Sequence, residues 1–207
     1  AVGVKYVLES PLRSLITNIR GTEAVLQAGA EHTRRVVVFS SSEVYGKGVS
    51  VPFSEDDDRL MGPTHKLRWS YAAGKAVDEC LAQAYWQQQQ LPVTVVRCFN
   101  TCGPRQSSAY GMVIPNMIQR ALRGEPILVF GDGQQSRCFS SVSDVIRGVL
   151  LLAESRAAEG EIFNIGTDEE VTILELALRV RDVCGSASPI EFVPYEDIYG
   201  SSFEDMR

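Results

Sequence analysis

The chain has 207 residues, and its 20 Lys and Arg against 26 Asp and Glu give a net charge of −6. This acidity argues against a nucleic-acid binder, which needs a basic surface to neutralise phosphates. With 44% hydrophobic and 22% charged residues the composition is that of an ordinary globular protein, and no apolar run approaches the roughly 20 residues of a membrane helix.

The N-terminal segment predicts a helix. The charges of Lys5, Glu9 and Arg13 interrupt any apolar core there, so no signal peptide is expected. In SPLRSLITNIRGTEAVLQAGA the apolar residues recur every three or four positions, with Ser10 as a possible N-cap and Pro11 at the first helical position. This pattern predicts a helix of about five turns.

Two unbroken apolar runs predict strands. RRVVVFSSS and VTVVRCFN show no alternation, which fits strands buried on both faces of a parallel sheet. Residues 44–69 lack any period and carry much charge, so we expect a long surface loop, and residues 70–90 predict a helix that ends before Pro92. The alternation of strand, helix and strand predicts right-handed βαβ units in an α/β protein with a doubly wound sheet.

Shorter elements follow residue 105. Their patterns predict helices at 112–124, 143–155 and 172–185, and strands at 126–130, 161–166 and 189–194. We therefore expect residues 1–105 to form a first domain and residues 106–207 a smaller second lobe, with discontinuous contributions between the two.

Tyr71 and Lys75 lie four residues apart on one predicted helix, which places the phenol and the ammonium on the same face. The pKa of a phenol is near 10, so it is a poor base at neutral pH, and a neighbouring cation favours its ionised form. Such a pair can shuttle a proton in an alcohol–ketone interconversion. A surface pair with no function is the alternative.

Polar residues follow both predicted strands of the first domain. Ser40–Glu43 come directly after Val36–Phe39, and Asn100 with the rigid Gly103-Pro104 turn follows the second strand. Open α/β sheets bind their ligands at the carboxyl ends of their strands. These clusters are therefore expected to converge with Tyr71 on one site.

Five cysteines occur without CxxC spacing. An odd number in apolar or motif segments favours reduced thiols and a cytoplasmic location. No metal site is assigned to them.

Five motifs together carry a family resemblance. FSSSEVYG, SYAAGK, RCFNTCGPRQ, GDGQQSRCFSSVSDV and FNIGTDEEVTI occur in this order and span essentially the whole chain. The sequence thereby resembles the extended short-chain dehydrogenase/reductase family, specifically its NAD-dependent nucleotide-sugar epimerases and dehydratases. The resemblance implies a partial Rossmann-type doubly wound parallel sheet with a small C-terminal α/β substrate lobe. It also implies NAD as cofactor, a nucleoside diphosphate sugar, UDP-linked, as substrate, and a homodimer formed through the helices at 10–28 and 66–89.

The resemblance also implies roles for individual residues. Tyr71 would be the catalytic base, Lys75 would hold the nicotinamide ribose and lower the pKa of Tyr71, Ser41 would hydrogen-bond the reacting sugar hydroxyl, and Phe99 would lie by the nicotinamide. The implied substrate-binding residues are Asn100 and Arg137 at the diphosphate, and Val113, Leu128 and Phe130 beside the base. For the two residues of this set on the predicted strand, plain core packing is the alternative.

Glu43 bears on the type of reaction. In dehydratases and decarboxylases of the family a carboxylate stands at this position, and it could abstract a proton next to a C4 ketone. Ser42, however, occupies the place of the acidic Asp of 4,6-dehydratases, and KLRWSY resembles both sugar epimerases and UDP-glucuronate decarboxylases. The first hypothesis is a UDP-hexose epimerase that acts by transient C4 oxidation. The alternatives are a UDP-glucuronate decarboxylase or sugar-nucleotide dehydratase that uses Glu43, and a truncated, inactive binding or assembly module.

The sequence departs from the family in two ways. Gly74 stands where the family usually has Ser, and no GxxGxxG turn is present, although that turn opens the family's chains and cradles the cofactor pyrophosphate. We therefore expect the first half of the cofactor domain to be missing from this chain. Val36–Phe39, or residues near Val2–Val4, would then form an exposed sheet edge prone to self-association.

Overall fold

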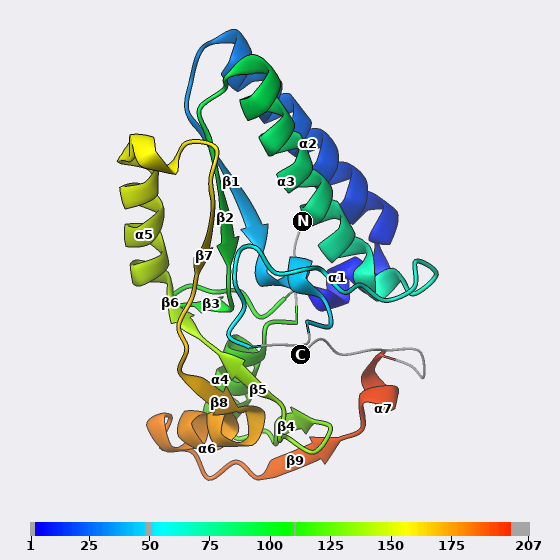
Figure 1. Cartoon of the computed structure of the whole chain (residues 1–207). Coiled ribbons are helices and arrows are strands. Elements are labelled where there is room, and N and C mark those ends of the chain that lie inside the picture. The colour runs from blue at the N-terminus through cyan, green and yellow to red at the C-terminus, as the bar shows by residue number, and fades with distance from the viewer. Residues whose placement is uncertain (1–2, 49–50, 110, 200–207) are drawn as a thin grey trace.

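The computed structural model describes residues 3–48, 51–109 and 111–199, which fold into two lobes (Figure 1). The larger lobe is built on a parallel sheet with the strand order β1-β2-β7. β1 spans Val36–Ser41, β2 spans Val93–Cys98 and β7 spans Ile162–Ile165. The first four residues of the central strand β2 are fully buried, as expected for a strand with layers on both faces.

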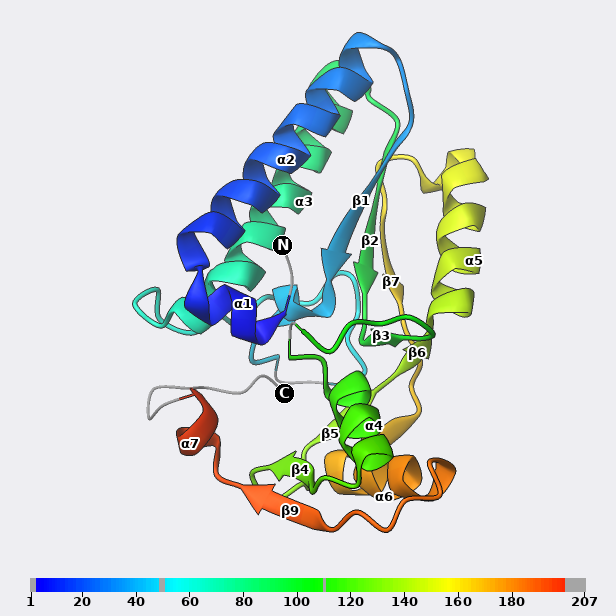
Figure 2. The same cartoon turned by 180° about the vertical axis from the view of Figure 1, so that it is seen from behind.

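Helices cover both faces of this sheet. α2 (Pro11–Glu31) and α3 (Ser70–Gln89) lie side by side on one face, and α5 (Val142–Glu154) covers the other, as Figures 1 and 2 show. Ser10 is the N-cap of α2 and Pro11 is in its first turn, as predicted, although the Ser10 side chain makes no capping hydrogen bond. The predicted α/β class with a doubly wound parallel sheet is confirmed.

The smaller lobe packs two helices against short strands. Its elements are α4 (Val113–Arg123), β4 (Ile127–Phe130), α6 (Ile173–Val183) and β9 (Ile190–Val193). β4 and β9 pair in parallel. α6 begins with a capping box, in which Thr172 accepts from the Glu175 backbone and Glu175 accepts from the Thr172 backbone.

Each lobe has its own hydrophobic core. In the larger lobe the core lies between α2, α3 and the sheet, and its buried members are Leu26, Val36, Val38, Ala82, Leu91, Val93 and Val95. In the smaller lobe the buried members are Met117, Ala121, Ile127, Val129, Val171, Ile173, Leu176, Ala177 and Val180. Two separate cores explain why the structure divides into two lobes.

The chain passes between the lobes three times. It leaves the first after β3 (Thr101–Cys102), returns between β5 (Ser136–Cys138) and β6 (Ser140–Ser141), and leaves again between β7 and β8 (Glu170–Thr172). β3 pairs in parallel with β6, and β5 pairs antiparallel with β8. α5 and β7 therefore belong to the first lobe although they follow residue 106, and the boundary at 105/106 stays a prediction.

Every helix and strand predicted from the periodicity is present, but two expectations about exposure were wrong. The segment 44–69 is not a surface loop throughout, because Val44 and Tyr45 in η1 (Ser42–Tyr45) and Trp69 in η2 (Leu67–Trp69) are buried. β1 is the edge of the described sheet, as expected, but it is not buried on both faces, since Phe39 is 51% exposed.

The exposed edge was expected at Val36–Phe39 or near Val2–Val4, and it is the first of these that the structure has. Val4 begins the short helix α1 (Val4–Glu9), so it is not part of a strand, and Val2 lies outside the described residues. The segment instead turns directly into α2.

Candidate active site

A cavity of about 1120 Å³ lies at the carboxyl ends of β1 and β2 and extends to the smaller lobe. Short helices at both ends of the described chain, α1 and α7 (Tyr195–Tyr199), contribute to its wall. The residues predicted for the site all line it, and they are Ser41, Glu43, Tyr71, Lys75, Phe99, Asn100, Val113, Leu128, Phe130 and Arg137. The fold thus brings together residues from six separate elements and from the segment after β2.

Tyr71 and Lys75 occupy the first turns of α3. Tyr71 is 8% exposed, and burial together with the negative charge of Glu43 raises its pKa to about 12, while a hydrogen bond with Ser41 acts in the opposite direction. The Lys75 ammonium donates to the Phe39 carbonyl oxygen over 2.8 Å and to Asp78 Oδ2 over 3.1 Å. The pKa of Tyr71 is therefore raised and not lowered as the sequence suggested, since buried surroundings and negative charges outweigh any effect of a lysine that is already paired.

Glu43 is held by an arginine that the sequence prediction did not assign to the site. Arg68 Nη1 donates to Glu43 Oε2 over 2.6 Å, and Arg68 Nη2 donates to Oε1 over 3.0 Å. Arg68 is only 5% exposed and lies over the ring of Trp69 at 5.5 Å. Its position in KLRWSY, three residues before Tyr71, was the available signal. Both oxygens of Glu43 are thus engaged by a bidentate ion pair in the cavity wall.

The strand β4 presents alternate residues to the core and to the cavity. Ile127 and Val129 are fully buried in the core of the smaller lobe, whereas Leu128 and Phe130 are partly exposed and line the cavity. The period of two in a strand accounts for this division. Plain core packing therefore does not describe Leu128 and Phe130. Val113, the first residue of α4, lies on the same wall.

The polar residues expected at a diphosphate lie where the two lobes meet. The Asn100 side-chain amide donates to the Cys138 carbonyl oxygen over 3.0 Å, and Arg137 Nη1 donates to the Ser136 carbonyl oxygen over 2.7 Å. The Asn100 bond joins the segment after β2 to β5, whereas the Arg137 bond lies within β5 itself. Phe99 precedes Asn100, and its backbone N–H donates to the Ile165 carbonyl oxygen.

A buried polar network lies beneath this site, and the sequence prediction missed it. Arg97 donates from Nε and Nη2 to the Glu79 carboxylate, and from Nη1 to Tyr45 Oη and to the Glu55 carbonyl oxygen. Tyr45 Oη donates in turn to Asn164 Oδ1 over 2.8 Å. These bonds fix the segment after β1 against β2 and β7. The network has no local sequence signal, because its members come from distant parts of the chain.

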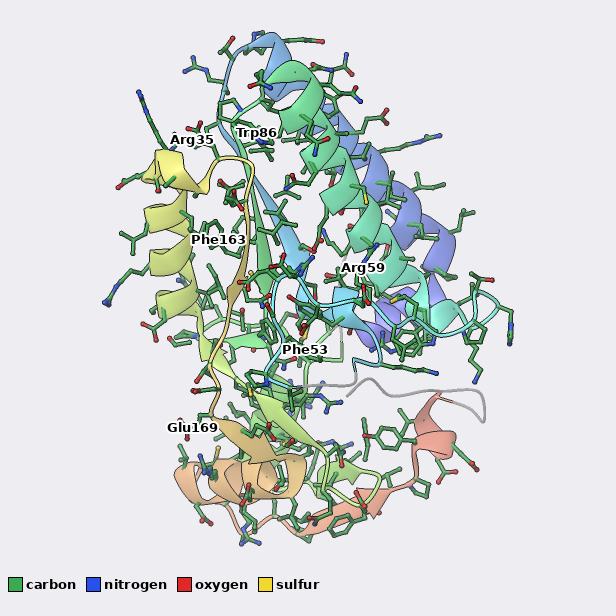
Figure 3. All side chains as sticks on the ribbon, in the orientation of Figure 1. Arg35, Phe53, Arg59, Trp86, Phe163 and Glu169 are labelled. Atoms are coloured by element: carbon green, nitrogen blue, oxygen red, sulfur yellow. The ribbon has the colours of Figure 1, made fainter. Side chains whose placement is uncertain are left out.

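Aromatic packing fixes the same segment. The Phe53 and Tyr45 rings stack with their centroids 4.6 Å apart, and Phe53 lies beside the carboxyl ends of the strands in Figure 3. The Asn164 side-chain amide donates to the Phe53 carbonyl oxygen. The charged segment that we expected to be a surface loop is therefore held in place at Phe53 by two contacts, the ring stack with Tyr45 and the hydrogen bond from Asn164.

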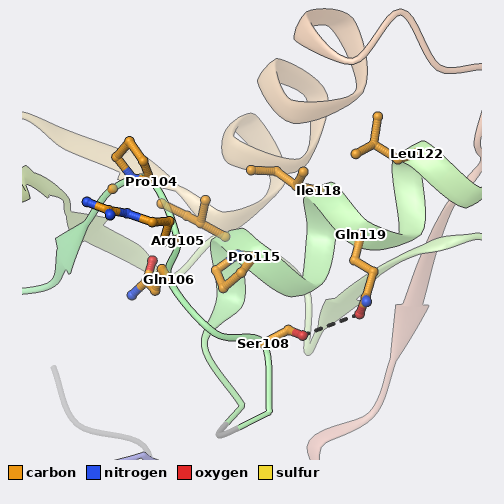
Figure 4. Close-up of a pocket in the computed structure, with 10 residues that line it drawn as sticks. Pro104, Arg105, Gln106, Ser108, Pro115, Ile118, Gln119 and Leu122 are labelled. Atoms are coloured by element: carbon orange, nitrogen blue, oxygen red, sulfur yellow. Dashed lines mark hydrogen bonds between the residues drawn. The ribbon is translucent and has the colours of Figure 1, made fainter.

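A second, smaller hollow of about 400 Å³ lies beside α4 (Figure 4). Ser108 hydrogen-bonds Gln119 across it, and Ile118 and Leu122 form its apolar side. It shares Gln106, Ser108 and two further residues with the wall of the large cavity. We regard it as the outer side of the loop at residues 103–108, part of which also borders the large cavity.

Within residues 3–48, 51–109 and 111–199, no helix is long and apolar enough to cross a membrane. Among the same residues no group of three or more His, Cys, Asp and Glu side chains is placed to hold a metal ion.

Known proteins show the same sequence pattern and fold. Residues 2–166 match the profile of the NAD dependent epimerase/dehydratase family. The chain is 45% identical over 206 residues to a UDP-N-acetyl-alpha-D-glucosaminuronate decarboxylase of Bacillus cytotoxicus. The matched region covers 99% of this chain and 63% of that protein. The chain thus spans less than two thirds of this relative's length.

Solved structures agree with the sequence match. A UDP-N-acetylglucosamine 4-epimerase from Methanobrevibacter ruminantium, in complex with UDP-N-acetylmuramic acid, superposes with a TM-score of 0.84 and 30% identity, over 93% of this chain and 61% of that one. A UDP-glucuronic acid 4-epimerase from Bacillus cereus, in complex with UDP-glucuronic acid and NAD, superposes with a TM-score of 0.77 and 29% identity, over 86% and 55% of the two chains.

Proposed function

The chain belongs to the NAD dependent epimerase/dehydratase family, and from this membership we propose that it acts on a UDP-linked hexuronate, oxidising C4 transiently and releasing the C6 carboxylate as carbon dioxide. The observation that carries the proposal is Glu43, paired with Arg68 in the cavity wall and close enough to Tyr71 for its charge to raise the pKa of the phenol. The 45% identity to a decarboxylase supports it. Epimerisation of a UDP-hexose, our first hypothesis from sequence, becomes the competing activity.

Tyr71 and Ser41 are the groups that would act on the C4 hydroxyl. Tyr71 takes the hydroxyl proton, and Ser41, which hydrogen-bonds the phenol, orients the same oxygen. Lys75 keeps one ammonium N–H for a ligand in the cavity after its bonds to Phe39 and Asp78. The raised pKa of Tyr71 means that a cation near the phenol is needed before it works as a base at neutral pH.

Decarboxylation follows from the position of the ketone. A C4 ketone would be β to the C6 carboxylate, and a β-keto acid can lose carbon dioxide because the ketone stabilises the electron pair left at C5. C5 would then take up a proton and C4 would regain its hydride, which makes the oxidation transient. Both oxygens of Glu43 accept from Arg68, which suits Glu43 to orienting the sugar or a water at C5 more than to taking a proton itself. This leaves Tyr71 as the principal proton carrier of the site.

The residues present fit the nicotinamide end of NAD. A lysine ammonium with a donor to spare, a buried phenol and Phe99 all line the cavity at the strand ends, where doubly wound sheets bind such cofactors. When bound, NAD supplies the hydride acceptor for C4 and a positive ring that favours the phenolate. The sequence contains no GxxGxxG turn, so these residues bear on the nicotinamide end of the cofactor and not on its pyrophosphate.

The substrate assignments follow the cavity wall. We assign Leu128, Phe130 and Val113 to the base, and Asn100 and Arg137 to the diphosphate, because the planar guanidinium of arginine matches phosphate oxygens. A homodimer and a cytoplasmic location remain predictions.

The decisive experiment supplies NAD with either UDP-glucuronate or UDP-N-acetylglucosaminuronate to the chain, and to the longer product if its reading frame continues. Release of carbon dioxide with a UDP-pentose product supports the proposal. A 4-epimer that keeps its carboxylate would instead establish epimerisation. No product from either sugar, with thermal stabilisation by UDP but not by NAD, would favour a binding module.

Variants separate the roles within the site. Tyr71→Phe should lower turnover by about 10² to 10⁴-fold, the contribution of a positioned proton carrier. Arg68→Lys retains the charge but loses the bidentate geometry, so it should lower carbon dioxide release while UDP binding persists. Unchanged release in Arg68→Lys would contradict the role given to the ion pair.

A further inference from the structure

Asp78 is a buried carboxylate that the proposed function does not use. It lies one helical turn after Lys75 on α3, is 0% exposed, and accepts from Lys75 Nζ at Oδ2 over 3.1 Å. Its other oxygen, Oδ1, is buried and has no hydrogen-bond partner among the residues that the structure describes. Burying a charge is costly unless it is paired, so Asp78 and Lys75 depend on each other for their place in the fold.

The pair determines where the lysine ammonium points. An ammonium has three N–H donors, and two of those on Lys75 are directed to Asp78 Oδ2 and to the Phe39 carbonyl oxygen at the edge strand β1. These two bonds come from different elements, α3 and β1. With both directions fixed, the third donor of Lys75 is held toward the cavity that Lys75 lines.

The same carboxylate alters the electrostatics at Tyr71. The charged and titratable groups that act on this phenol come from three elements: Glu43 from η1, Asp78 from α3 and Cys98 from β2, and each of them raises the Tyr71 pKa. Where α3 meets α2 at Gly74 the neighbour is apolar, because a Cβ at Gly74 would lie 3.2 Å from Leu15 Cδ2. The positive charge of Lys75 is therefore balanced within α3 before it can act on Tyr71.

We propose that Asp78 is a positioning residue, which holds the Lys75 ammonium against β1 and offsets its charge beside Tyr71. The structural part of this proposal concerns the Asp78–Lys75 pair alone. Its catalytic consequence rests on the proposed function, in which Tyr71 is the base. Asp78 does not touch the reacting atoms and is not itself catalytic.

The first test needs no variant of Asp78. The sequence has four lysines, Lys5, Lys47, Lys66 and Lys75, so the ¹H–¹⁵N spectrum of the lysine ammonium groups is simple to assign with Lys75→Arg. We expect the Lys75 ammonium to exchange its protons slowly and to show a scalar coupling from Nζ to the Asp78 carboxyl carbon. A Lys75 ammonium that exchanges as fast as an exposed lysine would overturn the proposal.

The second test measures the acetylation rate of each lysine by mass spectrometry after a short pulse of acetic anhydride. In Asp78→Asn, Lys75 should react about 5- to 50-fold faster, which corresponds to the coupling of two residues in direct contact. The matched control is Asp182→Asn on α6, whose carboxylate is 74% exposed. An unchanged rate at Lys75 in Asp78→Asn would refute the pairing, and a rise at all four lysines would signal unfolding, in which case the spectrum of the unaltered protein decides.

The third measurement is the pH profile of turnover. Because the charge of Asp78 is one cause of the raised Tyr71 pKa, Asp78→Asn should move the acidic limb to lower pH. A limb that stays in place, in a protein whose Lys75 has become reactive, would refute the electrostatic role of Asp78. If the lysine tests succeed and no hexuronate is turned over, it is the proposed function that fails.

Discussion

The buried ion pair beneath the site allows a quantitative test of how the fold holds it. Glu79 and Arg97 are each 5% exposed, and Arg97 donates to both oxygens of the Glu79 carboxylate. Glu79→Leu leaves the guanidinium buried without its counter-ion. Removing one partner of a buried pair costs about 3 to 5 kcal/mol, so we expect Glu79→Leu and Arg97→Leu each to lower the free energy of unfolding by that amount.

The double variant should cost much less than the sum. With both charges gone, the remaining losses are those of three neutral groups, the hydroxyls of Ser40 and Tyr45 and the Glu55 carbonyl oxygen, each of which loses one hydrogen bond. Each is worth about 1 kcal/mol, so the double variant should lose about 2 to 3 kcal/mol. The coupling energy between Glu79 and Arg97 is then several kcal/mol. It shows that the pair is more stable than either single variant, in which one charge stays buried alone.

Urea unfolding, followed by the fluorescence of Trp69 and Trp86, measures all four members of this cycle. Glu125→Leu is the control, since Glu125 lies 3.9 Å from Arg120 in an exposed pair and should change stability by no more than about 1 kcal/mol. A double variant whose loss equals the sum of the single losses to within about 0.5 kcal/mol would refute the reasoning.

Three further predictions test helix packing, pH dependence and the two faces of β4. In α2, Gly29→Ala should destabilise the protein by about 1 to 3 kcal/mol, because the new Cβ would lie 2.6 Å from a side-chain atom of β1. A Cβ at Gly21 would meet nothing within 4 Å, so Gly21→Ala should stabilise the protein by up to about 1 kcal/mol, and equal thermal shifts of the two variants would contradict this. The pKa of Tyr71 is raised to about 12 in the folded protein, so the unfolded chain loses the phenol proton at a lower pH than the folded one. The free energy of unfolding should therefore fall as pH rises from about 10 to 12, and it should fall less in Tyr71→Phe. Chemical denaturation at each pH measures both trends. Val129→Ala should cost about 2 kcal/mol of stability and leave UDP affinity intact, while Phe130→Ala should weaken UDP binding in calorimetry; the reverse pattern would mean that β4 does not face the nucleotide as assigned.

The elements of this fold could be predicted because their signals are local. The Ser10-Pro11 start of α2 and the unbroken apolar run of β2 each depend on residues close together in the chain. The convergence of Ser41, Tyr71 and Asn100 was also predictable, since the carboxyl ends of parallel strands share one edge.

What the sequence could not supply was pairing over long distances. Tyr71 and Lys75 suggested a lowered phenol pKa by their spacing alone. The pairing of Lys75 with Asp78, three residues later, is local, but the spacing does not reveal that the Phe39 carbonyl oxygen, 36 residues earlier, also binds the ammonium. The same holds for Arg68, whose value to the site depends on meeting Glu43 from 25 residues away. Electrostatic environment is a property of the folded site and not of a motif.

The prediction that the segment after β1 is exposed was wrong for a related reason. Its charge and lack of period predict a solvated loop, yet Tyr45 is fully buried because it stacks on Phe53 and hydrogen-bonds Asn164. An irregular segment can be buried when its polar groups find partners elsewhere in the fold. The hydrogen-bond partner Asn164 follows Tyr45 by 119 residues.

The three passages of the chain between the lobes restrict how the cavity can open. A hinge through a single linker could swing in any direction, but here three connections must bend together, and β3–β6 pairing ties two of them side by side. A rotation of one lobe against the other would therefore have to bend the chain beside Thr101 and Ser140, which pair at two of these crossings. We expect a ligand that bridges Phe130 and Asn100 across the cavity to oppose such a rotation.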